Sequence, residues 1–105
     1  MNKGVSLVLV GASGVVGSKI IKLLEKRTFP IAQFIPLGDS TVGSLIQLNN
    51  KGYKVESLEN FHPEKKQLII FSAGSSIAEK YAREFVDAGS FVIDLSSNFR
   101  YEDDV

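Results

Sequence analysis

Three glycines that recur every third residue are the strongest chemical signal in this sequence. Gly11, Gly14 and Gly17 join an apolar run, residues 5–10, to an amphipathic run that begins near Val15. At a strand-to-helix junction, the first glycine allows a sharp turn, the second lets bare backbone approach a ligand, and the third lets the helix lie close to the sheet. Unpaired N–H groups at the start of the helix carry the positive end of its dipole and favour an anion.

The stretch therefore predicts a binding loop for the pyrophosphate of a dinucleotide, with a glycine-rich turn that holds no ligand as the alternative. The residues assigned to this loop are Gly11, Ala12, Ser13, Gly14, Val15, Val16 and Gly17.

Polar residues that follow other predicted strands could complete the site. Asp39 lies 22 residues beyond Gly17, where a carboxylate accepts hydrogen bonds from the adenosine ribose and repels a 2′-phosphate. It therefore favours NAD over NADP, and a solvent-facing turn aspartate is the alternative. The run Ser72 to Ser75, which includes Ala73 and Gly74, offers amides and hydroxyls to the nicotinamide half, a role compatible with capping a helix. Arg100 suits bidentate recognition of a phosphate or carboxylate, although a surface arginine is the plainer reading.

The elements that must position these residues alternate between strands and helices. Strands are expected at residues 6–10, 32–37, 67–71 and 90–95, and helices at 15–27, 57–61 and 76–88. Residues 45–48 and 53–55 predict an antiparallel hairpin around a four-residue turn, 49–52, whose glycine takes a left-handed conformation. This order favours an α/β fold, a Rossmann-like, doubly wound and mostly parallel sheet with the hairpin as an insertion.

Two details of the helices are also expected. The buried face of the first helix is predicted to contain Val16, Ile20, Leu23, Leu24 and the stem of Arg27. Ser76 and Glu79 have the spacing of a capping box, and Gly89 is expected to end the second helix.

Composition limits the classes of function. A length of 105 residues suits one domain, residues 1–105, and 12 basic residues balance 12 acidic ones without a basic block, which argues against nucleic-acid and membrane partners. The absence of cysteine excludes disulfides, thiolate metal sites and a cysteine nucleophile from these residues. The only histidine, His62, has no partner ligands at metal spacing, so no metal is expected. Without a long apolar run or a leader, the chain is expected in the cytoplasm.

Four stretches together resemble the aspartate-semialdehyde dehydrogenase family, over essentially the whole chain but only that family's N-terminal cofactor domain. They are GASGVVG at 11–17, LLEKRTFP at 23–30, FSAG at 71–74 and VIDLSSNFR at 92–100, in the family's order and at its intervals. The resemblance implies a cofactor, NAD or NADP, held by Ala12 to Val16, Ala73 and Gly74, with Ser96 and Ser97 facing the nicotinamide. It also implies that Arg100 binds the phosphate of aspartyl phosphate or inorganic phosphate.

In that family the reaction is the reversible, NADP-dependent reduction of aspartyl phosphate to aspartate semialdehyde through a cysteine thioester, a step towards lysine, threonine and methionine. The resemblance implies that the cysteine and the acid/base histidine belong to a following domain of a dimeric parent. This chain then holds no catalytic residue and is inert alone, since a domain without the nucleophile cannot form the acyl-enzyme.

One stretch departs from the family pattern. Where family members commonly have a Ser-x-Arg-Ser type segment for the 2′-phosphate, this chain has Gly38, Asp39, Ser40 and Thr41. The departure leaves NADP preference open, and it also fits noncatalytic Usg-type paralogues that keep the fold for association or regulation. The related N-acetylglutamyl-phosphate reductases share the architecture and are a further alternative.

Overall fold

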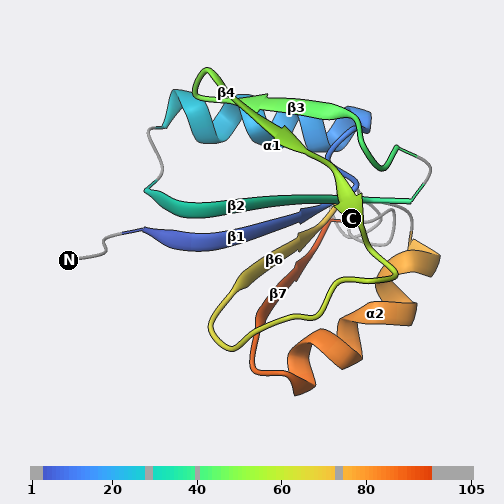
Figure 1. Ribbon diagram of the computed structural model, residues 1–105. Helices are drawn as coiled ribbons and strands as arrows, with labels where there is room; N and C mark the ends of the chain where they lie inside the picture. Colours follow the sequence, from blue (N-terminus) through green and yellow to red (C-terminus); the bar gives the residue numbers. More distant parts are fainter. Residues whose placement is uncertain (1–3, 28–29, 40, 73–74, 96–105) are drawn as a thin grey trace, which may run out of the picture.

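A parallel sheet of five strands runs through the centre of the molecule (Figure 1). The computed structural model describes residues 4–27, 30–39, 41–72 and 75–95. The strands are β1 (Val5–Val10), β2 (Ile31–Gly38), β5 (Glu56–Ser57), β6 (Leu68–Phe71) and β7 (Phe91–Asp94), in the order β5-β2-β1-β6-β7. Every neighbouring pair is parallel, which confirms the expected doubly wound α/β architecture.

The direction in which strands are added reverses at β1. The chain places β2 and then β5 on one side of β1, and it returns to the other side to place β6 and then β7. The carboxyl ends of β1 and β6 therefore flank the switch point, and Val10 is level there with Phe71. Open α/β sheets bind their ligands in the crevice at this point.

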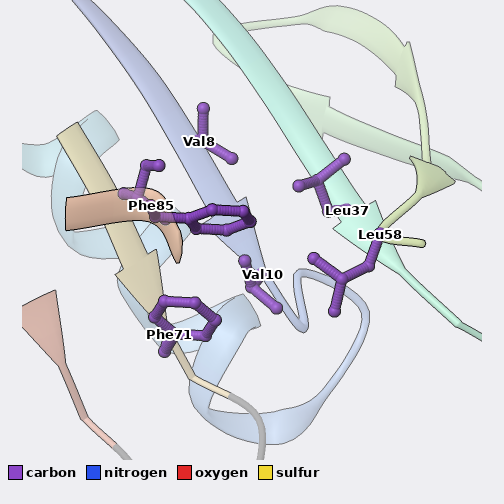
Figure 2. Packing of buried hydrophobic residues seen from close by; sticks show 7 residues of the cluster. Val8, Val10, Leu37, Leu58, Phe71 and Phe85 are labelled. Atoms are coloured by element: carbon purple, nitrogen blue, oxygen red, sulfur yellow. The ribbon is translucent and has the colours of Figure 1, made fainter. Parts of the chain in front are cut away.

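The core has two halves because β1 is covered on both of its faces. Val8 and Val10 pack on the side of α2 (Ser75–Asp87), where Phe71 and Phe85 stack with ring centroids 5.7 Å apart (Figure 2). Leu7 and Leu9, which alternate with them, pack on the opposite side. Figure 1 shows that α1 (Val15–Lys26) and the hairpin cover that side of the sheet. The buried end of β1 is thus held rigidly between two layers.

The buried face of α1 differs from the expected one. Gly17 and Ile21 are buried, with Ile20 and Leu24 partly buried beside them. The remaining expected members are exposed: Leu23 is 52% exposed, Val16 is 39% exposed, and Arg27 is exposed as well. The helix is rotated so that its glycine meets the preceding loop, and Leu23, two residues and about 200° beyond Ile21, then points outward.

The hairpin consists of β3 (Leu45–Leu48) and β4 (Lys51–Lys54), as the sequence predicted. The expected four-residue turn with a left-handed glycine is wrong. A two-residue turn is formed by Asn49 and Asn50, whose φ values are 52° and 68°, while Gly52 pairs with Gln47 inside the hairpin. Asparagine tolerates the left-handed region, and two such residues match the twist of the flanking strands.

The helix expected at residues 57–61 is also wrong. Glu56 and Ser57 form the short strand β5 beside β2, and the N–H of Leu58 donates to the carbonyl of Gly38 at 3.0 Å. Leu58 is 5% exposed and packs among the residues shown in Figure 2. Pairing with the edge of β2 and burial of Leu58 outweigh the weak local preference for helix.

The second helix, α2, ends as expected but begins differently. Its C-terminus is closed by bonds from the N–H of Gly89 to the carbonyl of Val86 and from Ser90 to Phe85, with Gly89 at a φ of 97°. Because α2 already includes Ser75, Ser76 lies within its first turn rather than at the cap that the predicted capping box requires.

Candidate functional site

The loop between β1 and α1 lies at the switch point of the sheet, as the glycine pattern predicted. Gly11 follows β1 directly and adopts a φ of 84°, a conformation that favours glycine. Its N–H donates to the carbonyl of Leu37 at 2.8 Å, and its carbonyl accepts the N–H of Gly14 at 3.0 Å. The turn is therefore tied both to the neighbouring strand and to its own far end.

Gly17 is required by packing. A Cβ atom on Gly17 would lie 2.4 Å from the carbonyl oxygen of Gly11 and 2.8 Å from that of Ala12. Both neighbours are backbone atoms of the loop, so the close approach predicted for the third glycine is made to the loop itself rather than to the sheet.

At Gly14, neither the backbone conformation nor the packing requires glycine. Its φ of −82° and ψ of 179° are extended values that any residue adopts. A Cβ atom there would meet only the carbonyl oxygen of Gly11, at an ordinary 3.5 Å. Neither conformation nor internal packing explains a glycine at this exposed position, whereas a ligand that must touch the backbone would.

The first turn of α1 presents free donors. Gly14 is the N-cap and supplies no side-chain hydrogen bond, and no acidic residue lies in the first turn. Within residues 4–27, 30–39, 41–72 and 75–95, the N–H groups of Val15, Val16 and Gly17 have no acceptor. Such N–H groups, with the dipole of a 12-residue helix behind them, suit an anion.

The other predicted site residues are distributed around this loop. Ser13 is exposed beside it, whereas Ala12 is 1% exposed and packs its methyl group in the core, so only its backbone could serve a ligand. Asp39 is exposed immediately after β2, at the same edge of the sheet as the loop. The remaining assignments lie outside the described residues: Ala73, Gly74, Ser96, Ser97 and Arg100.

Ser72 follows β6 and is turned towards β1. Its N–H donates to the carbonyl of Val10 at 3.0 Å, and its hydroxyl lies 2.7 Å from that oxygen and 3.2 Å from the carbonyl oxygen of Gly11. Sequence reasoning missed this contact, and also the contact of Leu37 with Gly11. Both engage backbone carbonyl groups, which leave no signal in residue types.

A groove of about 440 Å³ runs beside the loop, between α1 and the hairpin. Ala12 and Ser13 border one end, and its sides are formed by two sets of residues, Ser18, Ile21, Lys22 and Glu25 from α1 and Leu45, Ile46, Gln47 and Asn50 from the hairpin. The carboxylate of Glu25 accepts the N–H of Asn49 at 2.8 Å and so attaches the hairpin turn to the helix. The hairpin is thus attached to α1 next to the groove.

Two observations on metal ligands and helix length concern the part of the chain that the structure describes. No three of its His, Asp and Glu side chains are grouped closely enough to hold a metal ion. None of its helices is long and apolar enough to cross a membrane.

The reversal of strand order at β1 and the glycine turn into α1 are the features of a Rossmann-type α/β domain, the class to which this fold belongs. The sequence profile of one family, described as "Semialdehyde dehydrogenase, NAD binding domain", matches residues 6–105. The chain belongs to this family, and a nicotinamide dinucleotide is therefore its cofactor.

Individual relatives agree with this assignment. An aspartate-semialdehyde dehydrogenase of Campylobacter jejuni is 41% identical over 108 residues, which cover 100% of this chain and 32% of that protein. The crystal structure of aspartate semialdehyde dehydrogenase II from Vibrio cholerae, complexed with ASA, superposes with a TM-score of 0.86 at 31% identity, covering 94% of this chain and 33% of that one. A USG-1 protein homolog of Azotobacter vinelandii is 32% identical over 97 residues, 91% of this chain and 29% of that protein. The chain thus spans about a third of the length of the relatives it matches.

Proposed function

We propose that this chain is the cofactor-binding part of an aspartate-semialdehyde dehydrogenase and that its glycine loop, residues 11–17, holds the pyrophosphate of the dinucleotide. The observation that carries the proposal is Gly14, which the fold does not require to be glycine and whose Cβ direction is open. The free N–H groups of Val15, Val16 and Gly17 supply the donors, and the dipole of α1 supplies the positive potential.

For the full-length protein we propose the reversible, nicotinamide-dependent conversion of aspartyl phosphate to aspartate semialdehyde. The cofactor supplies the hydride when it is bound, and the residues of this chain bind and orient it. Because the sequence contains no cysteine, the thioester step cannot occur on this chain, and we expect the chain alone to be inert. Ala73, Gly74, Ser96 and Ser97 are proposed to border the cofactor and Arg100 to bind the substrate phosphate. The full protein is proposed to act as a cytoplasmic homodimer in amino-acid biosynthesis.

We further propose that NAD is preferred over NADP. Asp39 is exposed at the carboxyl end of β2, the neighbour of β1, and therefore lies at the same edge of the sheet as the glycine loop. A carboxylate at this place accepts hydrogen bonds from the ribose hydroxyls and repels a 2′-phosphate. The sequence after it, Ser40 and Thr41, brings no arginine to offset that repulsion.

A noncatalytic role is the second candidate. The departure at residues 38–41 fits a paralogue that keeps the fold for association or regulation, and the chain is also similar to the USG-1 protein homolog. Such a protein need not retain an open cofactor site, so binding of the dinucleotide separates the two candidates.

Calorimetric titration of the chain with NAD and NADP tests the proposal. We expect saturable binding of both, tighter for NAD, and loss of binding in Gly14→Val with the far-UV circular dichroism spectrum unchanged. The spectrum is expected to persist because the backbone at Gly14 is extended and its Cβ direction is open. No saturable heat with either dinucleotide would refute a working cofactor site and favour the noncatalytic role.

A further inference from the structure

The hydroxyl of Ser72 contacts the backbone where β1 passes into the glycine loop. Ser72 is partly buried, and its oxygen is 2.7 Å from the carbonyl oxygen of Val10 and 3.2 Å from that of Gly11. The carbonyl of Val10 is already bonded to the N–H of Ser72, as part of the contact between β1 and the end of β6. The single hydroxyl proton is therefore shared between two carbonyl oxygens, that of Val10 at the shorter distance and that of Gly11 at the longer one, and the second contact reaches the loop itself.

The orientation of that carbonyl determines where the next N–H points. The described peptide bonds are all trans, and in a trans peptide the C=O of one residue and the N–H of the next point in opposite directions. The oxygen of Gly11 accepts the N–H of Gly14 at 3.0 Å and the hydroxyl of Ser72 at 3.2 Å. The N–H of Ala12 is therefore directed away from both donors.

The N–H of Ala12 is an unusual group. Ala12 is 1% exposed, yet across the described ranges its N–H has no hydrogen-bond acceptor. Buried backbone donors are almost always paired, because an unpaired one loses its bond to water without replacement. A donor left unpaired beside the free N–H groups of α1 is what a bound oxyanion would satisfy.

We propose that Ser72 is a positioning residue of the cofactor site: its hydroxyl fixes the Gly11 carbonyl and so keeps the N–H of Ala12 aimed at the pyrophosphate. This inference rests on the proposed function. It gives Ser72 a role through the loop, in place of the direct contact with the nicotinamide half that its sequence position suggested. Ser72 follows β6 and the loop follows β1, so the hydroxyl joins the ends of the two strands that flank the switch point.

The expected change in cofactor affinity follows from the number of hydrogen bonds that Ser72→Ala removes. Ser72→Ala removes one hydroxyl donor but leaves the backbone bonds of Val10 and the bond from Gly14 to Gly11 in place. One hydrogen bond of this kind corresponds to roughly a three- to tenfold change in an equilibrium constant. We therefore expect weaker binding of the cofactor without loss of the fold.

The experiment compares NAD with ADP, a ligand that keeps the pyrophosphate but lacks the nicotinamide. By calorimetry, the Kd values of NAD and ADP are expected to rise by the same factor in Ser72→Ala, roughly three- to tenfold. Ser72→Thr, which keeps the hydroxyl, is expected to restore both values to within about twofold of the original chain.

Ser90→Ala is the matched control. The Ser90 hydroxyl also holds a backbone carbonyl, that of Glu64 at 2.9 Å, and Ser90 is 8% exposed, but it precedes β7 at the opposite end of the sheet. We expect Ser90→Ala to lower the Tm about as much as Ser72→Ala and to leave both Kd values unchanged.

Three results would overturn the positioning role. Weaker NAD binding with unchanged ADP binding would mean that Ser72 contacts the nicotinamide half. A lower Tm with both Kd values unchanged would mean that the hydroxyl serves stability alone, and equal losses in Ser72→Thr and Ser72→Ala would mean that the hydroxyl is not the cause. If the original chain binds neither NAD nor ADP, the proposed function itself fails, which the titration of the unsubstituted chain shows first.

Discussion

Replacing Gly14 or Gly17 of the loop by alanine should affect different properties of the protein, cofactor binding in one case and stability in the other. Gly14→Ala and Gly17→Ala each add one methyl group, three residues apart on the same turn of backbone. The structure assigns Gly17 to packing and leaves Gly14 without a structural reason. Gly17→Ala should therefore lower the stability of the fold. Gly14→Ala should weaken cofactor binding and leave the stability unchanged.

The cost of Gly17→Ala follows from the atoms that the new methyl group would meet. Contacts of 2.4 and 2.8 Å to the carbonyl oxygens of Gly11 and Ala12 force the loop to move, because neither neighbour is the end of a flexible side chain. Overpacking of this kind costs about 3 kcal/mol at the upper end of its range. Alanine recovers about 1 kcal/mol through its better helix propensity. The net loss is about 2 kcal/mol, which lowers the Tm of a domain of this size by roughly 10 °C.

Gly14→Ala should be close to neutral for stability. The residue keeps extended backbone angles that alanine adopts without strain, and the nearest atom to the new methyl group is 3.5 Å away. A poorer N-cap is offset by the lower entropy of the unfolded chain, so the free energy of unfolding should change by no more than about 0.5 kcal/mol. The methyl group instead covers backbone that the pyrophosphate would contact.

Urea unfolding followed by circular dichroism and differential scanning calorimetry measures both variants, and titration with NAD measures binding. We expect a large loss of stability for Gly17→Ala and weaker NAD binding for a stable Gly14→Ala. Equal destabilisation of the two variants would refute the assignment of different roles. A stable Gly14→Ala that binds NAD as well as the original chain would refute the functional reading of Gly14.

Two further predictions concern the ends of β2 and the hairpin. The double substitution Asp39→Ser with Ser40→Arg should reverse the preference from NAD to NADP in calorimetric titrations, because it removes a carboxylate and adds a guanidinium for the 2′-phosphate; an unchanged preference would contradict the role of Asp39. Asn50→Ala should lower the free energy of unfolding by about 1 kcal/mol, because φ at Asn50 is 68°, whereas Asn50→Gly should not; equal Tm values for the two variants would show that the turn is not strained.

The main elements were predictable because each has a local cause. The apolar run of β1 reads as a buried parallel strand, and residues 6–10 were expected where Val5–Val10 is found. The glycines at 11 and 17 could be assigned to a turn and a close approach from their spacing alone. These features depend on side-chain pattern over a few residues, which is what a sequence displays.

The errors arose where distant segments decide the outcome. Leu58 was expected in a helix, but the edge of β2 offers it a hydrogen bond and the core offers it burial. Leu23 was expected to face the core, but the contact of Gly17 with the loop fixes the rotation of α1. In both cases the competing contact joins parts of the chain whose proximity no local pattern reveals.

For the candidate site, the place of the glycine loop and of Asp39 in the fold was predictable, but not how the loop is held. The loop and Asp39 were placed at the correct edge of the sheet because parallel strands end together. The direction of the Ser72 hydroxyl was not foreseeable, since a serine at the end of a strand has the same pattern whether it faces a ligand or a neighbouring carbonyl. Only the distances to Val10 and Gly11 separate the two arrangements.

The N-cap of α1 suggests why this loop keeps a glycine where the fold would benefit from another residue. Serine or aspartate at an N-cap stabilises a helix by a few tenths of a kcal/mol relative to glycine, because its side chain accepts one of the free N–H groups of the first turn. At Gly14 that acceptance would occupy a donor that faces the proposed pyrophosphate, and an aspartate would add repulsion between like charges. An N-cap without a side chain leaves all those donors for the ligand. The chain therefore forgoes helix stability at the one place where a stabilising cap and a bound phosphate would compete for the same hydrogen bonds.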